Sequence, residues 1–245
     1  MINFKIIKLD ATDSTNDWLK EKFFQGNCIE GDLVWAYDQT KGRGQRENQW
    51  ISTPGKNLTF SLFKVFDKLS TRDQFLINCS VTLAIFMALK EINIPDLSLK
   101  WPNDILSGNK KIGGVLIENF VRGDRFSGTI VGVGLNVNQD NFDLFPKASS
   151  ILMLTQKEHD LDKLLKRLLE KFNVFFEQCK SENKIELINQ YQTHLYMKDQ
   201  WVVFEHSDSK LKGKIKGVNS KGKIKIEKEN GTVEYFSGGS LKLLY

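Results

Sequence analysis

The sequence of 245 residues (28.2 kDa) is long enough to bury a substantial core, as one large domain or as one domain with a small appendage. Hydrophobic residues make up 40% of it and charged residues 27%, with no run of 18 apolar residues, which excludes disordered, fibrous and membrane-spanning classes. The formal net charge is +5, and ten lysines against six acids fall in residues 198–245, so an anionic partner of that segment is conceivable.

The cysteines and the first residues indicate where in the cell the protein works. The three cysteines lie far apart and include no CxxC pair, so neither a disulfide framework nor a structural zinc site is expected. The first residues, MINFKIIKLDATDSTN, alternate as a strand does and lack the charged leader and apolar run of a signal peptide. We therefore expect a cytoplasmic protein.

Hydrophobic periodicity predicts alternating strands and helices in the first part of the chain. The elements expected there are strands over 2–10, 31–40 and 57–66, a helix capped by Asp13 or Ser14, a loop over 41–50, and a mostly buried helix over 74–93 that Pro95 ends. The loop is expected because glycines and charges alternate too densely in KGRGQRENQW for a helix or a packed strand.

The second part continues this pattern and then changes. Strands are expected over 97–101, 110–121 and 126–138, and helices over 160–180 and 185–195. From Trp201 the chain consists of short β-prone pieces divided by Asn-Gly or Lys-Gly turns, which is typical of a small barrel. The sequence thus predicts an α+β domain over 1–197 and a small β-barrel domain over 198–245.

Two strands carry glycines where side chains are expected. Alternation in TIVGVGLNVN places Gly132, Gly134 and Asn136 on one face of a strand. On a different strand, KKIGGVLIE places Lys111 near Gly114. A flat or ring-shaped ligand would fit against such a bare face, although a helix or neighbouring backbone packed on the glycines would explain them equally well. Lys111 could offset the charge of a carboxylate or phosphate, or simply flank the turn before it.

Two further segments could bind anions. The loop GRGQR offers free backbone N–H groups with Arg43 and Arg46, and Trp50 at its far end could stack on a base or belong to the core. In KWPNDIL the proline forbids a ladder bond, so Asn103 and Asp104 lie at a strand end, where they could bind Mg²⁺ or form a plain turn.

Protein nucleophiles and zinc are not expected. The three histidines all lie late in the chain, and neither a GxSxG elbow nor an HExxH or Cys/His zinc spacing occurs. What remains is a set of cations, backbone amides and side-chain amides, which is suited to moving a phosphoryl or adenylyl group by positioning and electrostatics.

Taken together and in order, five segments resemble the biotin protein ligases over nearly the whole chain. They are DSTN at 13–16, QTKGRGQR at 39–46 with Trp50, KWPNDIL at 100–106, KKIGGVLIE at 110–118 and GVGLNVN at 132–138. The resemblance implies a mixed-sheet catalytic domain followed by a Src-homology-like barrel. It also implies that biotin and Mg-ATP form biotinyl-5′-AMP, from which biotin passes to one lysine of a biotin carboxyl carrier protein of a biotin-dependent carboxylase.

The resemblance also implies roles for single residues. Lys111 and Arg43 would be catalytic, and Asp104 would hold Mg²⁺. Biotin would be bound by Ser14, Thr15, Asn16, Gln39, Gly42, Arg43, Gly44, Gln45, Lys111, Gly114, Gly132 and Gly134. ATP would be bound by Arg43, Arg46, Trp50, Lys100, Asn103, Asp104, Lys111 and Asn136.

The sequence departs from the family pattern in the loop, where Gln45 replaces a common arginine and Glu47 a common glycine. The loop therefore has one cation fewer and one anion more than the family pattern, and these charges affect how firmly the loop retains the adenylate. The ligase pattern starts by residue 13, so we expect a monofunctional ligase without the DNA-binding domain and repressor function of some family members.

Two other functions are compatible with parts of the sequence. A lipoate or octanoate ligase or transferase could use a related fold, but a long acyl chain would need an apolar tunnel, whereas Ser-Thr-Asn and Gln suit a compact polar bicycle. A nucleic-acid-binding module is a lesser alternative, because the lysines of the barrel can be the solvated face of alternating strands. We expect no DNA or membrane partner, and the sequence leaves a homodimer open.

Overall fold

A computed structural model describes residues 1–179, 184–207 and 209–244, and its main feature is a seven-stranded mixed sheet. The strands follow the order β1-β2-β3-β7-β6-β5-β4, in which β1 and β2 are parallel and every other pair is antiparallel. Their bounds are β1 Lys5–Thr12, β2 Asp32–Gln39, β3 Leu58–Lys64, β4 Leu97–Lys100, β5 Asp104–Ser107, β6 Lys110–Arg122 and β7 Arg125–Leu135. This confirms the predicted mixed sheet.

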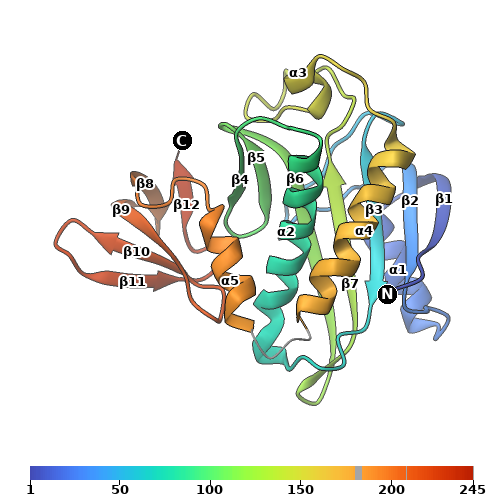
Figure 1. The fold of residues 1–245 in the computed structure, drawn as a ribbon, viewed down its shortest axis with the longest axis horizontal. Helices are drawn as coiled ribbons and strands as arrows, with labels where there is room; N and C mark the ends of the chain where they lie inside the picture. The colour runs from blue at the N-terminus through green and yellow to red at the C-terminus, as the bar shows by residue number, and fades with distance from the viewer. Residues whose placement is uncertain (180–183, 208, 245) are drawn as a thin grey trace.

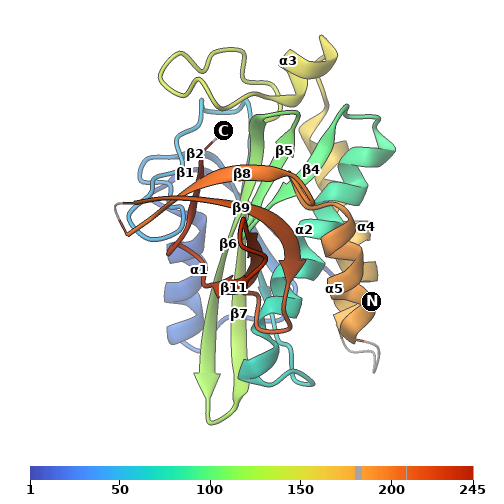
Figure 2. The ribbon, with the colours of Figure 1, turned by 90° about the vertical axis from the view of Figure 1, so that its left-hand side faces the viewer.

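Helices cover both faces of this sheet (Figures 1 and 2). Helices α2 and α4 lie together on one face, and α1 lies on the opposite face. The helices are α1 Thr15–Phe24, α2 Gln74–Glu91, α3 Ile151–Thr155, α4 Leu161–Cys179 and α5 Lys184–Thr193, with a short 3-10 turn at Thr71–Asp73. The main core lies between the sheet and α2 and α4, where the fully buried Phe60, Phe66, Phe172 and Phe176 pack edge to face or stacked.

Helix α2 is the apolar centre of the fold. With its preceding turn it spans Thr71–Glu91, and by length and composition alone it could cross a membrane. However, 72% of its most apolar window is buried inside the protein, between the sheet and helices α4 and α5. A core helix of a folded domain accounts for this apolarity, as the broad apolar spacing of the sequence predicts.

The last part of the described chain forms a second, five-stranded antiparallel sheet with the order β11-β10-β9-β8-β12. Its strands are β8 Trp201–His206, β9 Ser209–Val218, β10 Ile224–Lys228, β11 Val233–Phe236 and β12 Lys242–Leu244. This sheet lies beside α5 and β4 (Figure 1). It corresponds to the predicted barrel strands, although its edge strands β11 and β12 are not paired with each other in the described residues.

Several boundaries differ from those predicted. Strand β1 begins at Lys5 instead of residue 2. Helix α2 ends at Glu91 instead of residue 93, so Pro95 is not the residue that ends it. Strand β7 ends at Leu135, and the end of the helix predicted to 180 lies outside the described residues. Strand β5 and helix α3 were not predicted, because each is too short to show a hydrophobic period.

The packing of α4 against the sheet yields a stability prediction. Phe172 is fully buried and stacks on Phe176, so Phe172→Ala should lower the free energy of unfolding by about 3–5 kcal/mol, measured by urea denaturation. The matched control on the same helix is Val174→Ala, since Val174 is 52% exposed, and it should change stability by less than about 0.5 kcal/mol. Equal effects of the two substitutions would contradict this packing.

Candidate functional site

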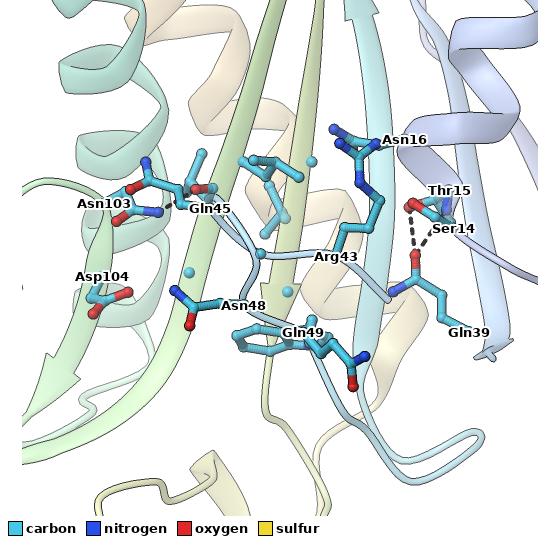
Figure 3. A pocket seen from close by; sticks show the side chains of 18 of the residues that line it. Ser14, Thr15, Asn16, Gln39, Arg43, Gln45, Asn48, Gln49, Asn103 and Asp104 are labelled. Atoms are coloured by element: carbon cyan, nitrogen blue, oxygen red, sulfur yellow. Dashed lines mark hydrogen bonds between the residues drawn. The ribbon is translucent and has the colours of Figure 1, made fainter. Parts of the chain in front are cut away.

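A cavity of about 440 Å³ opens on the α1 side of the sheet, where five segments distant in the sequence meet (Figure 3). These are the start of α1, the end of β2 with the loop after it, residues 103 and 104 at the start of β5, the first half of β6 and the end of β7; Phe60 of β3 and Phe145 also line the cavity. The sequence-predicted residues that line it are Ser14, Thr15, Asn16, Gln39, Arg43, Gly44, Gln45, Trp50, Asn103, Asp104, Lys111, Gly114, Gly132 and Gly134.

One end of this cavity is a network of amides and hydroxyls. The backbone N of Thr15 donates to Oε1 of Gln39 at 2.8 Å, and the Thr15 hydroxyl, 3.0 Å from the same oxygen, shares its one hydrogen between Gln39 and Ser61. The hydroxyls of Thr15 and Ser61 are 2.7 Å apart, and that of Ser61 donates to Oδ1 of Asn16 at 2.6 Å. Nδ2 of Asn16 in turn donates to Oε2 of Glu118 at 2.7 Å. Because each group is tied to the next, their orientations are fixed before any ligand arrives.

Helix α1 places the first part of this network. Ser14 is its N-cap, and its hydroxyl accepts from the backbone N of Asp17 at 3.4 Å, so the structure selects Ser14 over Asp13 as the cap. Ser14, Thr15 and Asn16 are all at most 4% exposed. The cap therefore fixes the direction in which the helix start faces the cavity.

Two members of the network, Ser61 and Glu118, were missed from the sequence. Ser61 is fully buried on β3, and Glu118 follows the glycine segment on β6. The available signal was the alternation of NLTFSLF, which places Ser61 on the opposite face from Phe60 and Leu62. A small polar residue in an otherwise apolar buried strand points to a polar partner.

The glycines of β6 and β7 form the base of the cavity, and protein side chains share the space above them. A Cβ on Gly132 would lie 2.2 Å from Oδ1 of Asn16, and one on Gly134 would lie 2.3 Å from Cε2 of Trp50. A Cβ on Gly114 would lie 3.2 Å from Cε of Lys111. Side chains pack on these glycines, and all three glycines still line the cavity, so a ligand beside them stays a prediction.

The loop after β2 folds back on itself across the mouth of the cavity. The backbone N of Trp50 donates to the carbonyl of Gly42 at 2.8 Å, and that of Gly44 to the carbonyl of Asn48 at 2.7 Å. Gly42 is buried beneath this turn, since its Cβ would lie 2.2 Å from the Trp50 carbonyl oxygen, and it does not line the cavity.

The two arginines of the loop point to different partners. The guanidinium of Arg43 forms ion pairs with Asp17 on α1 and, at 3.3 Å, with Glu118 on β6. The guanidinium of Arg46 instead donates to the carbonyls of Gly238 and Gly239, at 2.9 Å each, in the turn between β11 and β12. Arg46 is thus outside the cavity in this structure and links the loop to the second sheet.

The other end of the cavity is charged. Nζ of Lys111 lies 2.6 Å from Oδ1 of Asp104, and Nζ of Lys100 lies 3.4 Å from the other oxygen of that carboxylate. Lys111 Nζ also lies 5.6 Å from the ring centroid of Trp50. The backbone of Lys111 is held on both sides by the segment before α3, through hydrogen bonds of 2.7 and 2.9 Å to Lys147 and Ser149.

A second cavity of about 450 Å³ continues from this charged end. It shares Trp50, Asp104 and Lys111 with the first and is lined on another side by the segment 142–148, which is mostly apolar. Lys100 and Asn136 line it. Nδ2 of Asn136 donates to the Ser149 carbonyl at 3.0 Å, but its buried Oδ1 has no hydrogen-bond partner, and neither has Nε1 of Trp50. Unpaired buried polar atoms are rare in proteins, and ligand binding is one reason for them.

Candidate metal ligands are sparse among the described residues of both cavities. Within residues 1–179, 184–207 and 209–244, no three His, Cys, Asp or Glu side chains are grouped to hold a metal. Among the described residues, Asp104 is the only acidic one that lines either cavity. Burial lowers the pKa of His159 and His194, and neither lines a cavity. The three cysteines form no disulfide.

Comparison with known proteins identifies the family. The model of the Biotin/lipoate A/B protein ligase family matches residues 9–136, slightly more than half of the chain. This protein belongs to that family. The matched part contains the sheet except for the first half of β1, and it contains every residue that lines the first cavity apart from Phe145. The resemblance found in the sequence is therefore confirmed.

Individual relatives agree with this. The chain is 25% identical to the bifunctional ligase/repressor BirA of Salmonella typhimurium, over 96% of this chain and 73% of that protein. It is 29% identical to the biotin–[acetyl-CoA-carboxylase] ligase of Mycobacterium tuberculosis, over 70% of this chain and 64% of that protein. The biotin protein ligase of Aquifex aeolicus, solved with biotin and ATP, superposes with a TM-score of 0.83 at 28% identity, over 98% of both chains.

The buried network leads to a pH-dependent prediction. Asn16→Asp would place a carboxylate against Glu118 and remove the donor that now satisfies it, which should destabilise the protein by about 1–3 kcal/mol at pH 7.5. Repulsion between like charges raises the pKa of the pair, so the loss should shrink as the pH falls to 5 and one carboxyl takes up a proton.

Urea denaturation at the two pH values measures this loss, with Asn109→Asp in the exposed turn before β6 as the control. A loss that is independent of pH, or that is matched by the control, would show that Asn16 and Glu118 are not adjacent.

Proposed function

We propose that this protein is an ATP-dependent biotin protein ligase, which activates biotin as biotinyl-5′-AMP and transfers it to one lysine of a biotin carboxyl carrier domain. The observation that carries this proposal is the position of Lys111, which belongs to the walls of both cavities. A cation shared by two adjoining cavities is placed to act on two substrates at the point where they react.

The first cavity suits the ring system of biotin. A cyclic urea has one strong acceptor and two N–H donors, and these match the hydroxyl and amide groups of Ser14, Thr15, Asn16 and Gln39. Lipoate has no such groups, so it would gain no hydrogen bonds from the hydroxyls and amides at this end. The network thus favours biotin over lipoate, the other substrate class of the family.

The second cavity suits the nucleotide. Its walls near Phe142, Leu144 and Phe145 are apolar and fit the faces of a base, and Trp50 offers a ring for stacking. The unpaired Oδ1 of Asn136 is an acceptor, so it suits the exocyclic amino group of adenine. Guanine has a carbonyl at that position, so this acceptor would disfavour it.

The reaction then requires little of the protein beyond positioning and charge. An oxygen of the biotin carboxylate attacks the α-phosphorus of ATP, and the bond from that phosphorus to the pyrophosphate oxygen breaks. Lys111 would stabilise the negative charge that grows on the phosphoryl oxygens, and Arg43 would close the loop over the product. In the second step the acceptor amine attacks the acyl carbon and AMP leaves, so no nucleophile of the enzyme takes part.

Magnesium fits the site through one carboxylate. Mg²⁺ in ATP-using enzymes is commonly held by one or two carboxylates together with the phosphates, and Asp104 is the carboxylate that lies at the junction of the cavities. Its chemistry would be charge neutralisation on the phosphates. We also place the protein in the cytoplasm, which the lack of a disulfide among its three cysteines supports.

The direct test is to incubate the protein with biotin, α-labelled ATP and the apo carrier domain of an acetyl-CoA carboxylase. We expect a labelled adenylate that requires biotin, and then biotin on one lysine of the carrier. Lipoate and octanoate are tested in parallel. An adenylate formed with lipoate but not with biotin, or no adenylate with any acid, would refute the proposal.

Lys111→Ala should separate catalysis from binding. We expect adenylate formation to fall by about two to three orders of magnitude, because a charge that acts mainly in the transition state is lost. The Kd for biotin, measured by calorimetry, should change by less than about threefold, because the network around Thr15 and Gln39 is untouched. Lys110→Ala, the neighbouring lysine, which bonds to the Pro146 carbonyl, is the control. Equal losses in rate and affinity would contradict this role.

A further inference from the structure

Glu118 on β6 lines neither cavity, yet its carboxylate is bonded to a residue that lines the first one. Its Oε2 accepts a hydrogen bond from Nδ2 of Asn16 at 2.7 Å. Its Oε1 lies 3.3 Å from the guanidinium of Arg43 and 3.6 Å from Nζ of Lys20. The two oxygens of this carboxylate therefore serve different partners, because one faces an amide and the other faces two cations.

The carboxylate determines which way round the amide of Asn16 lies. An ionised carboxylate accepts hydrogen bonds and donates none, so Asn16 can face Glu118 only with its NH2 group. The carbonyl oxygen of the same amide then points the other way, where it accepts from the hydroxyl of Ser61 at 2.6 Å. That oxygen lies over Gly132, since a Cβ on this glycine would be 2.2 Å from it. A side chain that donates at position 118 would instead favour the opposite orientation of the amide.

The orientation of this amide determines the direction of the next two hydrogen bonds. A hydroxyl has one hydrogen to donate, and that of Ser61 is engaged with Asn16. At the 2.7 Å contact between the two hydroxyls, Thr15 must therefore be the donor. Hydrogen bonds thus run in one direction through Thr15, Ser61, Asn16 and Glu118, which we call the Thr15–Glu118 series. The first three of these residues are at most 4% exposed, so water offers them few other partners.

The direction of the series decides what this end of the cavity offers to a ligand. Thr15 and Gln39 line the cavity beside each other (Figure 3). Because the Thr15 hydroxyl shares its hydrogen between Ser61 and Gln39, its oxygen is left to accept from a ligand. Oε1 of Gln39, 3.0 Å away, is an acceptor as well. Two neighbouring acceptors suit an N–H group and repel an oxygen that carries no hydrogen.

We propose that Glu118 is a positioning residue, which fixes the direction of the Thr15–Glu118 series so that Thr15 and Gln39 accept from a urea N–H of biotin. Glu118 touches no substrate and acts through Asn16 and Ser61. The inference rests on the proposed ligase function and names a residue that sets its selectivity. A ligand with an oxygen in place of this N–H would meet lone pairs where biotin makes a hydrogen bond, and the site would reject it.

A second carboxylate separates this role from that of an ion pair. Asp17 on α1 holds the guanidinium of Arg43, as Glu118 does. The carboxylate of Asp17, however, lies outside the Thr15–Glu118 series. Removal of its charge therefore weakens the attachment of Arg43 and leaves the direction of the series unchanged. D17N is thus a matched control for a substitution at Glu118.

The test is E118Q, a variant of nearly the same size and shape. Its amide has one oxygen, which Arg43 and Lys20 attract, so its NH2 group faces Asn16 and reverses the series. The ligands are biotin and its two cyclic carbamate analogues, in each of which a ring oxygen replaces one urea N–H. We expect the unmodified protein to bind one analogue about 100-fold or more weakly than biotin, measured by calorimetry. In E118Q this ratio of Kd values should fall at least about tenfold, because the hydrogen of Thr15 is released toward the ligand.

D17N should keep the ratio of the unmodified protein within about threefold. A ratio that stays the same in E118Q, or that falls equally in D17N, would overturn the inference while leaving the ligase function intact. Two other results would overturn it as well: an equal loss of affinity for biotin and both analogues in E118Q, and an unmodified protein that binds both analogues as tightly as biotin. Failure of the unmodified protein to bind biotin at all would instead refute the ligase function itself.

Discussion

The site depends on a stretch of β-sheet without side chains. Gly114 on β6 is the cross-strand neighbour of Gly134 on β7, and Gly132 pairs with Leu116 one step further along. Three missing side chains on one face create the depth that a seven-stranded sheet would otherwise lack. Asn16 and Trp50 lean over this depression from opposite sides and leave the cavity between them. The remaining features, a hydroxyl and amide network at one end and a cation at the other, are arranged around it.

The loop over 41–50 connects this depression to the rest of the molecule. Arg43 holds the loop to α1 and β6, while Arg46 holds it to the second sheet through two carbonyls. The loop that covers the cavity is thus also part of the contact between the two sheets. Gln45 of the same loop lines the cavity.

Sequence patterns predicted those parts of the structure that depend on residues close together in the chain. The strands, the long helices and the five glycine-rich or charged segments follow from periodicity and spacing, and most of the predicted site residues line one of two adjoining cavities. Contacts between distant segments were not foreseen. Ser61 and Glu118 enter the site through pairing across strands, and Arg46 reaches residues 238 and 239, which no local pattern encodes. The short strand β5 was not predicted because four residues are too few to show a hydrophobic period.

The central claim concerns where one ligand lies, and a crystal structure of this protein with biotin and a non-hydrolysable ATP analogue tests it most directly. The account predicts that the fused rings lie over the glycines of β6 and β7 within hydrogen-bonding reach of Thr15 and Gln39. It also predicts that the carboxylate faces Nζ of Lys111, with adenine beside Asn136. Biotin bound elsewhere, or bound with its carboxylate turned away from Lys111 toward α1, would contradict it.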